Sequence, residues 1–325
     1  MKILVIFTGG TIGSSVKNGW IGIDAQTRYT LLNNYKGDKD YIEFHTCSPY
    51  SVLSENLSAA ELNSLQAEIS KNLSLDYGGI IITHGTDTLQ YTSSAIEYAF
   101  CDSKIPIVFV SADYPLENPK SNGNANFEAA VEFIKSKSAS GVFVAYKNTN
   151  ENHANIHIAS RIVQHRECDA NIYSIDGFSF AIYNHEIKKN NISLSCSVKP
   201  TGIVNYSEKS NILTIESVPG CSYSHSLEGI NAVILKPYHS ATLNTKSKEL
   251  SEFCKKAAEE NIPVFVVNVP DGIKYESSKE FDNLGIIPLP YSTYISVYMK
   301  LWIAISNKYD IIDYMKNPVA NEFIL

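Results

Sequence analysis

The stretch that decides the fold lies at the start of the chain, where residues 3–13 read ILVIFTGGTIG. Five consecutive apolar residues, Ile3–Phe7, end at Thr8-Gly9-Gly10. A continuous apolar run of this kind is typical of a strand that is buried on both faces of a parallel sheet. Ligands of such sheets bind beyond the carboxyl ends of the strands. The glycine-rich loop at residues 8–13 therefore stands where a binding site is expected.

Similar apolar runs recur along the chain, and each is followed by a turn and a helix-like stretch. The runs occupy residues 79–82, 105–110, 141–145, 232–235 and 264–267. The amphipathic stretches, with apolar residues at helical spacing, occupy residues 58–73, 93–100, 126–137 and 246–260. Strands that alternate with helices predict an α/β fold with a mostly parallel sheet flanked by helices.

This alternation weakens between residues 184 and 210, where the chain is polar and contains Pro200-Thr201-Gly202. We interpret this part as a short antiparallel excursion followed by a connection. The alternation resumes at residues 211–215. We therefore expect a larger N-terminal domain at 1–185 that carries the functional loops, a connecting segment at 186–210, and a smaller C-terminal α/β domain at 211–325. A length of 325 residues suits two average domains or one large one, at ~150 residues per domain.

Composition excludes several classes of function. The net charge of −7 argues against a nucleic-acid partner. With 44% apolar and 19% charged residues, the chain is ordinary for a globular protein and is not disordered as a whole. No apolar stretch approaches the ~18 residues of a membrane span, and the apolar run at 3–7 is shorter than the ~7–15 residues of a signal-peptide core. We expect a cytoplasmic protein with neither nucleic acid nor membrane as a partner.

Cysteine and histidine spacing gives no sign of a metal site. The nearest two of the six cysteines, Cys196 and Cys221, are 25 residues apart, so there is no CxxC motif. Isolated cysteines in a chain of this length indicate reduced thiols in an intracellular protein. The eight histidines are scattered along the sequence. The sequence therefore predicts neither a metal nor another cofactor.

The loop at residues 8–13 matches neither common nucleotide-binding motif. No lysine follows Gly13, as a P-loop requires, and residues 9–14 read GGTIGS rather than GxGxxG. Two interpretations stay open. The loop is a tight turn with incidental threonines, or its backbone N–H groups approach a small polar substrate while Thr11 presents a nucleophilic hydroxyl.

A second polar loop, Thr83-His84-Gly85-Thr86-Asp87-Thr88, follows the apolar run at 80–82. Polar groups at the end of a buried strand are costly unless they are hydrogen-bonded. A carboxylate between two hydroxyls suits a substrate with both an amide and an ammonium group. Alternatively, Thr86 or Thr88 caps the helix that begins near Leu89, and the two roles are compatible. His84 is a base in one interpretation and a structural hydrogen-bonding residue in the other.

The two loops in this order, with Thr11 and Thr86 separated by 75 residues, resemble the asparaginase/glutaminase family, in particular its cytoplasmic type I members. Residues 111–116 and 121–127 are similar to a loop of that family, and Tyr238–Thr242 to a turn of its C-terminal domain. The resemblance covers essentially the whole chain. It implies hydrolysis of the side-chain amide of L-asparagine to L-aspartate and ammonia, without metal or cofactor, by a homodimer or homotetramer.

The resemblance also implies roles for individual residues. Thr11 stands at the position of the attacking threonine, and Thr86 and Asp87 match the second threonine and the aspartate that binds the substrate's α-ammonium group. Residues 53–57 are similar to the loop that grips the amino-acid end of the substrate. Ser54 would donate to the α-carboxylate, and Glu55 would accept from the α-ammonium group.

Two positions depart from the family pattern. Trp20 stands where a loop tyrosine is expected, and an indole cannot accept a proton, so Tyr29 is the candidate for supplying the phenol. His165 or Gln164 stands where the family has a lysine. A neutral histidine is a base near pH 7, so His165 is the candidate replacement, and a surface histidine is the alternative. The departures leave open a non-catalytic amino-acid binding protein, and the substrate could also be another amide such as glutamine.

Overall fold

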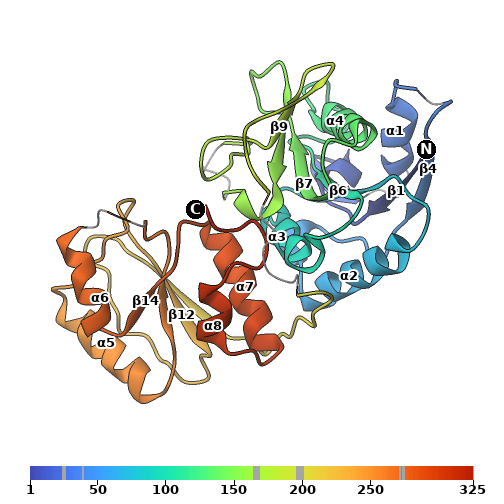
Figure 1. The fold of residues 1–325 in the computed structure, drawn as a ribbon. Coiled ribbons are helices and arrows are strands. Elements are labelled where there is room, and N and C mark those ends of the chain that lie inside the picture. Colours follow the sequence, from blue (N-terminus) through green and yellow to red (C-terminus); the bar gives the residue numbers. More distant parts are fainter. Residues whose placement is uncertain are drawn as a thin grey trace. The chain divides into compact units, whose positions relative to one another are not determined.

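The computed structural model describes residues 1–23, 27–38, 40–163, 169–194, 201–270, 272 and 275–324 (Figure 1). The chain folds into two compact units. The first comprises Met1–Val204 together with Val319–Asn321, and the second comprises Asn205–Pro318 together with Glu322–Leu325. The two units are described separately below.

The first unit is built on an eight-stranded sheet in the order β10-β9-β8-β7-β6-β5-β1-β4. The strands are β1 (Lys2–Phe7), β4 (Glu43–Cys47), β5 (Gly79–Thr83), β6 (Pro106–Val110), β7 (Gly141–Tyr146), β8 (Ala154–Ile158), β9 (Ala181–Tyr183) and β10 (Ile187–Lys189). The five strands from β4 to β7 in the sheet are mutually parallel, and β8, β9 and β10 extend the sheet with antiparallel pairing. The predicted mostly parallel α/β fold is confirmed.

Helices cover both faces of this sheet (Figure 1). The core against α1 (Thr27–Asn34) and α4 (Gly123–Ser136) contains Ile3, Val5 and Phe7. The core against α2 (Ala59–Leu73) and α3 (Leu89–Phe100) contains Leu4 and Ile6. Successive residues of a strand point to opposite faces, so the unbroken apolar run at 3–7 is what a strand between two helical layers requires.

Helix α3 differs from its sequence-based expectation. The chain around residues 93–100 predicts an amphipathic helix with a solvated face, but every residue of α3 except Tyr91 is buried. Its polar members, among them Ser94 and Glu97, therefore need hydrogen-bond partners inside the protein.

The second unit contains a four-stranded parallel sheet in the order β11-β12-β13-β14. Its strands are β11 (Ile212–Glu216), β12 (Ala232–Lys236), β13 (Val264–Val266) and β14 (Ile286–Pro288). Helices α5 (Lys248–Glu259) and α6 (Glu280–Asn283) share one core with it, and α7 (Tyr294–Ser306) and α8 (Ile311–Lys316) share the other. This sheet is the predicted smaller C-terminal α/β element.

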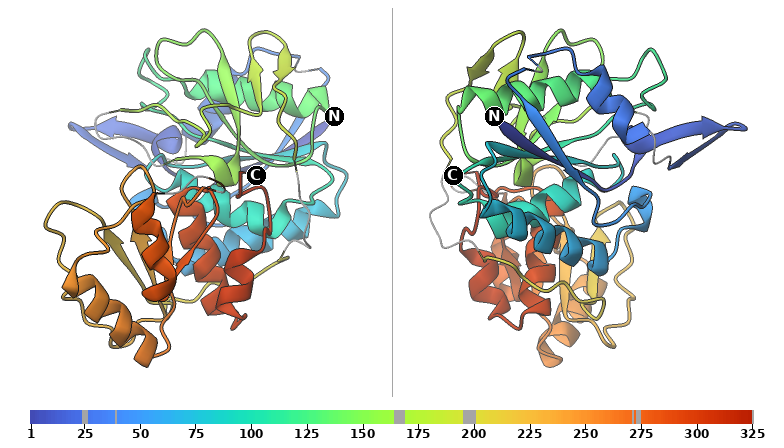
Figure 2. Two further views of the ribbon diagram at one scale, coloured as in Figure 1. Left: turned by 60° about the vertical axis from the view of Figure 1, so that its left-hand side comes forward. Right: turned by 90° about the vertical axis from the view of Figure 1, so that its right-hand side faces the viewer.

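Short elements connect the strands of the first unit. The turns that matter below are η1 (Thr11–Gly13), η2 (Ser54–Asn56) and η3 (Ala159–Arg161); a fourth, η4 (Glu276–Lys279), lies in the second unit. The hairpin of β2 (Ser14–Lys17) and β3 (Trp20–Ile23) follows η1 and extends away from the sheet (Figure 2). Its turn residues Asn18 and Gly19 both have positive φ, as a tight hairpin turn requires.

The cysteines correct one expectation. Cys47, Cys221 and Cys254 are free thiols, but Cys101, which follows α3, is disulfide-bonded. The prediction of reduced cysteines is therefore wrong for Cys101; sequence spacing failed here because a disulfide joins residues that are distant in the chain. Among the described helices, none is long and apolar enough to cross a membrane.

Candidate active site

The strand order of the first unit reverses between β1 and β5. From β1 the chain moves to β4 on one side, and it then returns to β5 on the other side and continues to β6 and β7. The loop after β1 leads to the α1 face of the sheet and the loop after β5 leads to the α3 face. Ligands of open α/β sheets bind where the strand order reverses in this way, outside the carboxyl ends. The two polar loops predicted from the sequence flank this point.

Close approaches of the chain bring three loops together where the strand order reverses. A Cβ atom on Gly10 would lie 2.2 Å from the backbone nitrogen of Gly85, and a Cβ atom on Gly85 would lie 2.4 Å from Ser54 Oγ. Gly10 also has a φ of +75°, which side chains rarely adopt. The glycines are therefore required for the approach of the loops, and this approach brings the segments of Thr11, Ser54 and Thr86 side by side.

Side-chain hydrogen bonds fix the same loops. Thr8 Oγ1 donates to the carbonyl of Thr83 at 2.6 Å. Thr88 Oγ1 donates to the carbonyl of Ser54 at 2.9 Å. Thr88 does occupy the N-cap position of α3, but its side chain makes no capping bond. The hydroxyl of Thr88 ties η2 to the start of α3 and does not cap the helix.

The candidate residues differ in exposure. Thr11 is the first residue of η1 and is half-buried, as is Thr86. Ser54 is buried at 6% exposure, whereas Glu55 and Asp87 are exposed. The loops thus gather two half-buried hydroxyls, one buried hydroxyl and two solvent-facing carboxylates. This set suits a small substrate that carries a carboxylate, an ammonium group and an electrophilic carbon.

Of the residues at the departures from the family pattern, the structure describes Trp20 and Tyr29, and both are exposed. Trp20 is 80% exposed on β3, and Tyr29 is 57% exposed on α1, next to η1. Within the described residues, the Tyr29 hydroxyl makes no hydrogen bond, and its role in the site stays a prediction. His165 and Gln164 lie outside the described residues.

His84 is a buried structural residue. It is 2% exposed, and its Nδ1 lies 2.8 Å from the carbonyl oxygen of Gly85. Burial lowers the pKa of His84 to about 4, so its imidazole is neutral at pH 7. Of its two interpretations, this geometry favours the structural hydrogen-bonding role.

Acid should destabilise the protein through His84 and the equally buried His157. Burial lowers the pKa of both to about 4, whereas the unfolded chain takes up these protons near pH ~6.5. Between pH 6.5 and 4 the unfolded state binds more protons than the folded state. The free energy of unfolding therefore falls as the pH is lowered, by about 3 kcal/mol per histidine. Urea unfolding at pH 7.5 and 4.5 measures this loss. His157→Gln should lose less than the wild type, and the exposed control His225→Gln should match the wild type. If His157→Gln lost as much unfolding free energy as the wild type, a lowered pKa of His157 would be contradicted.

The loop after β6 is held by two hydrogen bonds between Asp113 and Asn122. Asp113 Oδ1 accepts from the backbone nitrogen of Asn122, and Asn122 Oδ1 accepts from that of Asp113, both at 3.0 Å. Asn122 Nδ2 also donates to the carbonyl of Lys147 at 2.8 Å. These contacts order the segments 111–116 and 121–127 beside a cavity of about 600 Å³ at the carboxyl ends of β6 and β7.

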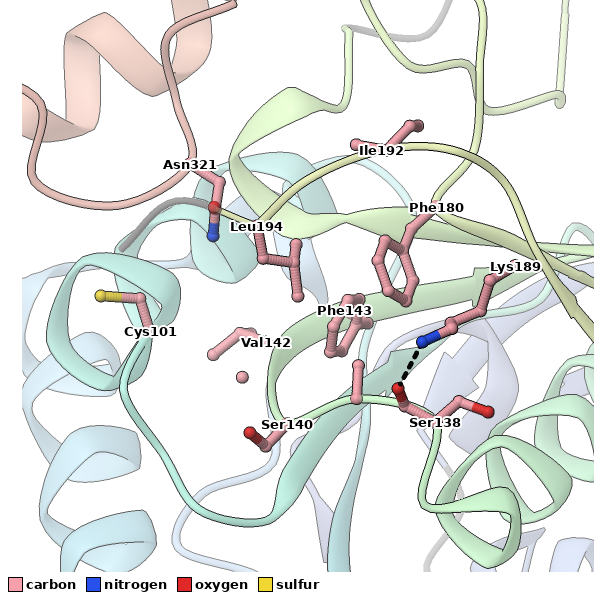
Figure 3. Close-up of a pocket in the computed structure, with 12 residues that line it drawn as sticks. Cys101, Ser138, Ser140, Val142, Phe143, Phe180, Lys189, Ile192, Leu194 and Asn321 are labelled. Carbon is pink, nitrogen blue, oxygen red and sulfur yellow. Dashed lines mark hydrogen bonds between the residues drawn. The ribbon is translucent and has the colours of Figure 1, made fainter. Parts of the chain in front are cut away.

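A second cavity lies at the opposite ends of the strands, near the amino end of β7. It has a volume of about 440 Å³ and is lined by Phe143, Phe180 and Leu194, with Lys189 donating to the carbonyl of Ser138 at 3.1 Å (Figure 3). Gly141 at the amino end of β7 also lines it. Because the catalytic candidates lie beyond the carboxyl ends, this cavity is not part of the candidate site.

The sequence did not predict the hydrogen bonds that Glu97 of α3 makes inside the protein. Glu97 is fully buried and accepts hydrogen bonds from Ser160 and Asn321. Its only signal in the sequence is a lone carboxylate in an otherwise uncharged stretch, LQYTSSAIEYAF. In the part of the chain that the structure describes, no cluster of three or more His, Cys, Asp or Glu residues could hold a metal.

The family model for the N-terminal region of asparaginases matches residues 2–186, which is more than half of the chain. The chain belongs to the asparaginase family of amidohydrolases. The resemblance inferred from the two loops is thereby confirmed.

Individual relatives are distant. A glutamyl-tRNA(Gln) amidotransferase subunit of Methanobrevibacter smithii is 25% identical over 99% of this chain and 77% of its own length. Six proteins of the same name from other organisms match about half of this chain, and the alignments span only 36–38% of their length. The L-asparaginase of Thermococcus kodakarensis is 24% identical over 96% of this chain and 94% of its own length.

Solved structures share the fold over the whole chain. The thermostable L-asparaginase from Thermococcus kodakarensis superimposes with a TM-score of 0.83, 24% identity and complete coverage of both chains. L-asparaginase I from Vibrio cholerae O1 biovar eltor gives a TM-score of 0.79 at 20% identity, with coverage of 100% of this chain and 99% of the other. At these identities the likeness establishes the fold.

Proposed function

We propose that the protein hydrolyses the side-chain amide of L-asparagine to L-aspartate and ammonia. The observation that carries the proposal is the meeting of three loops beyond β1 and β5, where Gly10 approaches Gly85 and Gly85 approaches Ser54. That meeting juxtaposes a threonine hydroxyl with groups suited to the two charged ends of an amino acid. The family membership supports the same reaction class.

In the proposed reaction, the hydroxyl oxygen of Thr11 attacks the amide carbon. A covalent ester forms, the C–N bond breaks, and the amide nitrogen leaves as ammonia after taking up a proton. Backbone N–H groups of the loops would stabilise the negative oxygen of the tetrahedral intermediate. A water molecule near Thr86 then hydrolyses the ester and restores the hydroxyl of Thr11. We place His165 as the candidate base and Tyr29 as the candidate phenol.

Recognition of the free amino acid falls to the other loop residues. Ser54 would donate to the α-carboxylate, and the exposed carboxylates of Glu55 and Asp87 would accept from the α-ammonium group. Because these groups lie on η2 and on the loop before α3, the hydrogen bond between Thr88 and Ser54 holds the two halves of the recognition site together.

The test is ammonia release by the purified protein from L-asparagine, L-glutamine and their D-forms. Release from L-asparagine with the highest kcat/KM supports the proposal. Glutamine is the second candidate, because several relatives are named as subunits of a glutamyl-tRNA(Gln) amidotransferase. Binding of asparagine without ammonia release would instead identify a non-catalytic amino-acid binding protein.

Asp87→Asn should raise KM for L-asparagine at least about tenfold and change kcat much less. The variant removes the negative charge that faces the ammonium group, and a hydrogen bond to a charged group contributes about 1.5–3 kcal/mol. Steady-state kinetics measures the effect. Asp102→Asn, at the other end of α3, is a matched control for loss of an exposed carboxylate. An unchanged KM in Asp87→Asn would place the ammonium site elsewhere.

We also propose that the protein assembles as a homodimer or homotetramer, as the family resemblance implies. Sedimentation velocity of the purified chain distinguishes these two states from a monomer, which would contradict the proposal.

A further inference from the structure

The cavity of about 600 Å³ at the carboxyl ends of β6 and β7 has no part in the proposed hydrolysis. It is formed by the loop after β6, the start of α4, the chain that follows β7 and Ala170, all in the first unit. Among the described residues that line it, none belongs to the candidate active site. Its volume lies within the range of about 300–1,000 Å³ that is usual for sites of small organic ligands. We call it the β6–β7 cavity.

Three asparagine side chains hold the walls of the β6–β7 cavity in place. Asn122 Nδ2 donates to the carbonyl of Lys147 at 2.8 Å, which joins the loop after β6 to the chain after β7. Asn126 Oδ1 accepts from the backbone nitrogen of Lys147 at 2.7 Å. Asn148 bonds both backbone groups of Ile172, at 3.0 and 2.9 Å. The cavity is therefore preformed, and binding of a ligand would require little ordering of the chain.

The two carboxylates that line the β6–β7 cavity are already hydrogen-bonded within the protein. Asp113 Oδ1 accepts from the backbone nitrogens of Tyr114 and Asn122, at 2.9 and 3.0 Å. Glu151 Oε2 accepts from Asn155 Nδ2 at 2.6 Å. Each carboxylate thus fixes a loop of the cavity wall, and part of its capacity to accept hydrogen bonds is used.

The two lysines that line the β6–β7 cavity are in a different state. Lys120 precedes α4 and Lys147 follows β7, so their ammonium groups come from two different walls. Within the part of the chain that the structure describes, neither ammonium group forms an ion pair or a hydrogen bond, and the hydroxyl of Thr149 in the same lining forms no hydrogen bond either. An ammonium group only donates hydrogen bonds. The free capacity of the lysines is therefore that of cationic donors, which suits an anion.

We propose that the β6–β7 cavity binds a small organic anion, with a carboxylate or phosphate group at Lys120 and Lys147. Oxygen atoms of either group accept charge-assisted hydrogen bonds from ammonium groups. A lone phosphate ion would leave most of the cavity empty, so the ligand carries an organic body. Tyr114 and Pro119 also line the cavity and offer flat apolar surfaces to that body. The inference goes beyond the proposed function and does not depend on it.

Isothermal titration calorimetry of the full chain tests the proposal. The probes are inorganic phosphate, succinate, citrate and adenosine monophosphate, each titrated to millimolar concentrations. At least one of the organic anions should bind as one molecule per chain and more tightly than inorganic phosphate. Succinate and citrate carry carboxylates and the nucleotide carries a phosphate, so the probe that binds identifies the anionic group. No saturable binding of any probe, or phosphate binding as tightly as the organic anions, would overturn the proposal.

Lys147→Gln tests where the anion binds. The variant removes one ammonium group, so Kd should rise about tenfold or more, as the loss of a hydrogen bond to a charged group implies. Lys120→Gln should have the same effect from the opposite wall. Lys104→Gln is the matched control, because Lys104 is an exposed lysine just before the amino end of β6 and its loss changes the net charge equally. A wild-type Kd in both cavity variants would place the anion elsewhere and overturn the proposal.

Ala125→Phe tests the cavity independently of charge. Ala125 is a half-buried lining residue in the first turn of α4, and a phenyl group there would occupy space in the cavity. The variant should lose binding while its net charge stays the same. Circular dichroism and the melting temperature show whether it is folded. Wild-type binding in folded Ala125→Phe would contradict the cavity as the site.

Thr11→Ala keeps this inference separate from the proposed function. The residue does not line the β6–β7 cavity, so the variant should bind the anion with the wild-type Kd even when it releases no ammonia. A Kd that changed in Thr11→Ala would indicate that the anion binds in the candidate active site, which would overturn the inference. A wild-type protein that binds the anion through Lys120 and Lys147 but hydrolyses no amide would overturn the proposed function alone.

Discussion

Thr11→Ala should abolish ammonia release while leaving the fold intact. The variant removes only the hydroxyl and methyl group of a half-buried loop residue, so the sheet and both of its cores keep their contacts. Loss of a catalytic nucleophile costs about 10⁴- to 10⁶-fold in kcat. Ammonia release should therefore fall to the detection limit, with an unchanged circular dichroism spectrum and melting temperature.

Two variants sharpen the test of Thr11. Thr11→Ser keeps a hydroxyl at the same position and should retain measurable turnover. Thr214→Ala removes a threonine hydroxyl from β11 of the second unit and should retain wild-type kcat. If Thr11→Ala turned over at near the wild-type rate, the nucleophile would have to be another residue, and the roles assigned to this loop would be wrong.

The sequence predicted the parts of the fold that a buried environment imposes. The apolar runs at 3–7, 79–82, 105–110 and 141–145 became β1, β5, β6 and β7, because a strand between two helical layers is apolar on both of its faces. The edge strand β4, with the sequence EFHTC, was not predicted. An edge strand is partly exposed and carries no continuous apolar run, so periodicity does not distinguish it from a loop.

Helix α3 shows why hydrophobic periodicity does not predict buried polar residues. Hydrophobic periodicity records which positions avoid water, and it treats a polar residue as solvent-facing. Glu97 satisfies its carboxyl group through partners 63 and 224 residues away, a pairing that no local pattern encodes. The same limit applies to Cys101, whose disulfide the spacing of cysteines did not indicate.

The sequence predicts where the candidate site lies but not which contacts between the loops build it. Two polar loops after buried strands of one parallel sheet must lie at the same edge, and this follows from strand direction alone. The contact between Gly10 and Gly85, and the hydrogen bond from Thr88 to Ser54, depend on how closely the loops approach. The sequence offered an N-cap as an alternative for Thr88, and only the geometry shows that its hydroxyl is used elsewhere.

Gly10→Ala should therefore damage the site severely, although it adds only a single methyl group. The added Cβ would lie 2.2 Å from the backbone nitrogen of Gly85, whereas ordinary van der Waals contact begins near 3.4 Å. Because both neighbours are backbone, no side chain can rotate away, and the loops of Thr11 and Thr86 must separate by roughly 1 Å. Displacement on that scale costs about 10²-fold in rate. The φ of +75° adds strain of about 1–2 kcal/mol for a residue with a Cβ, and overpacking adds about 1–3 kcal/mol.

The expected result for Gly10→Ala is a fall in kcat/KM of at least about 10²-fold, together with a loss of roughly 2–5 kcal/mol in the free energy of unfolding. Steady-state kinetics and urea unfolding measure the two effects. Gly13→Ala is the matched control, since it lies in the same loop and a Cβ there meets nothing within 4 Å. Gly13→Ala should keep both its stability and most of its activity. Because the two variants add the same methyl group three residues apart, only the approach of Gly10 to Gly85 can account for a difference between them. Equal behaviour of the two would mean that the loops do not meet as the structure describes.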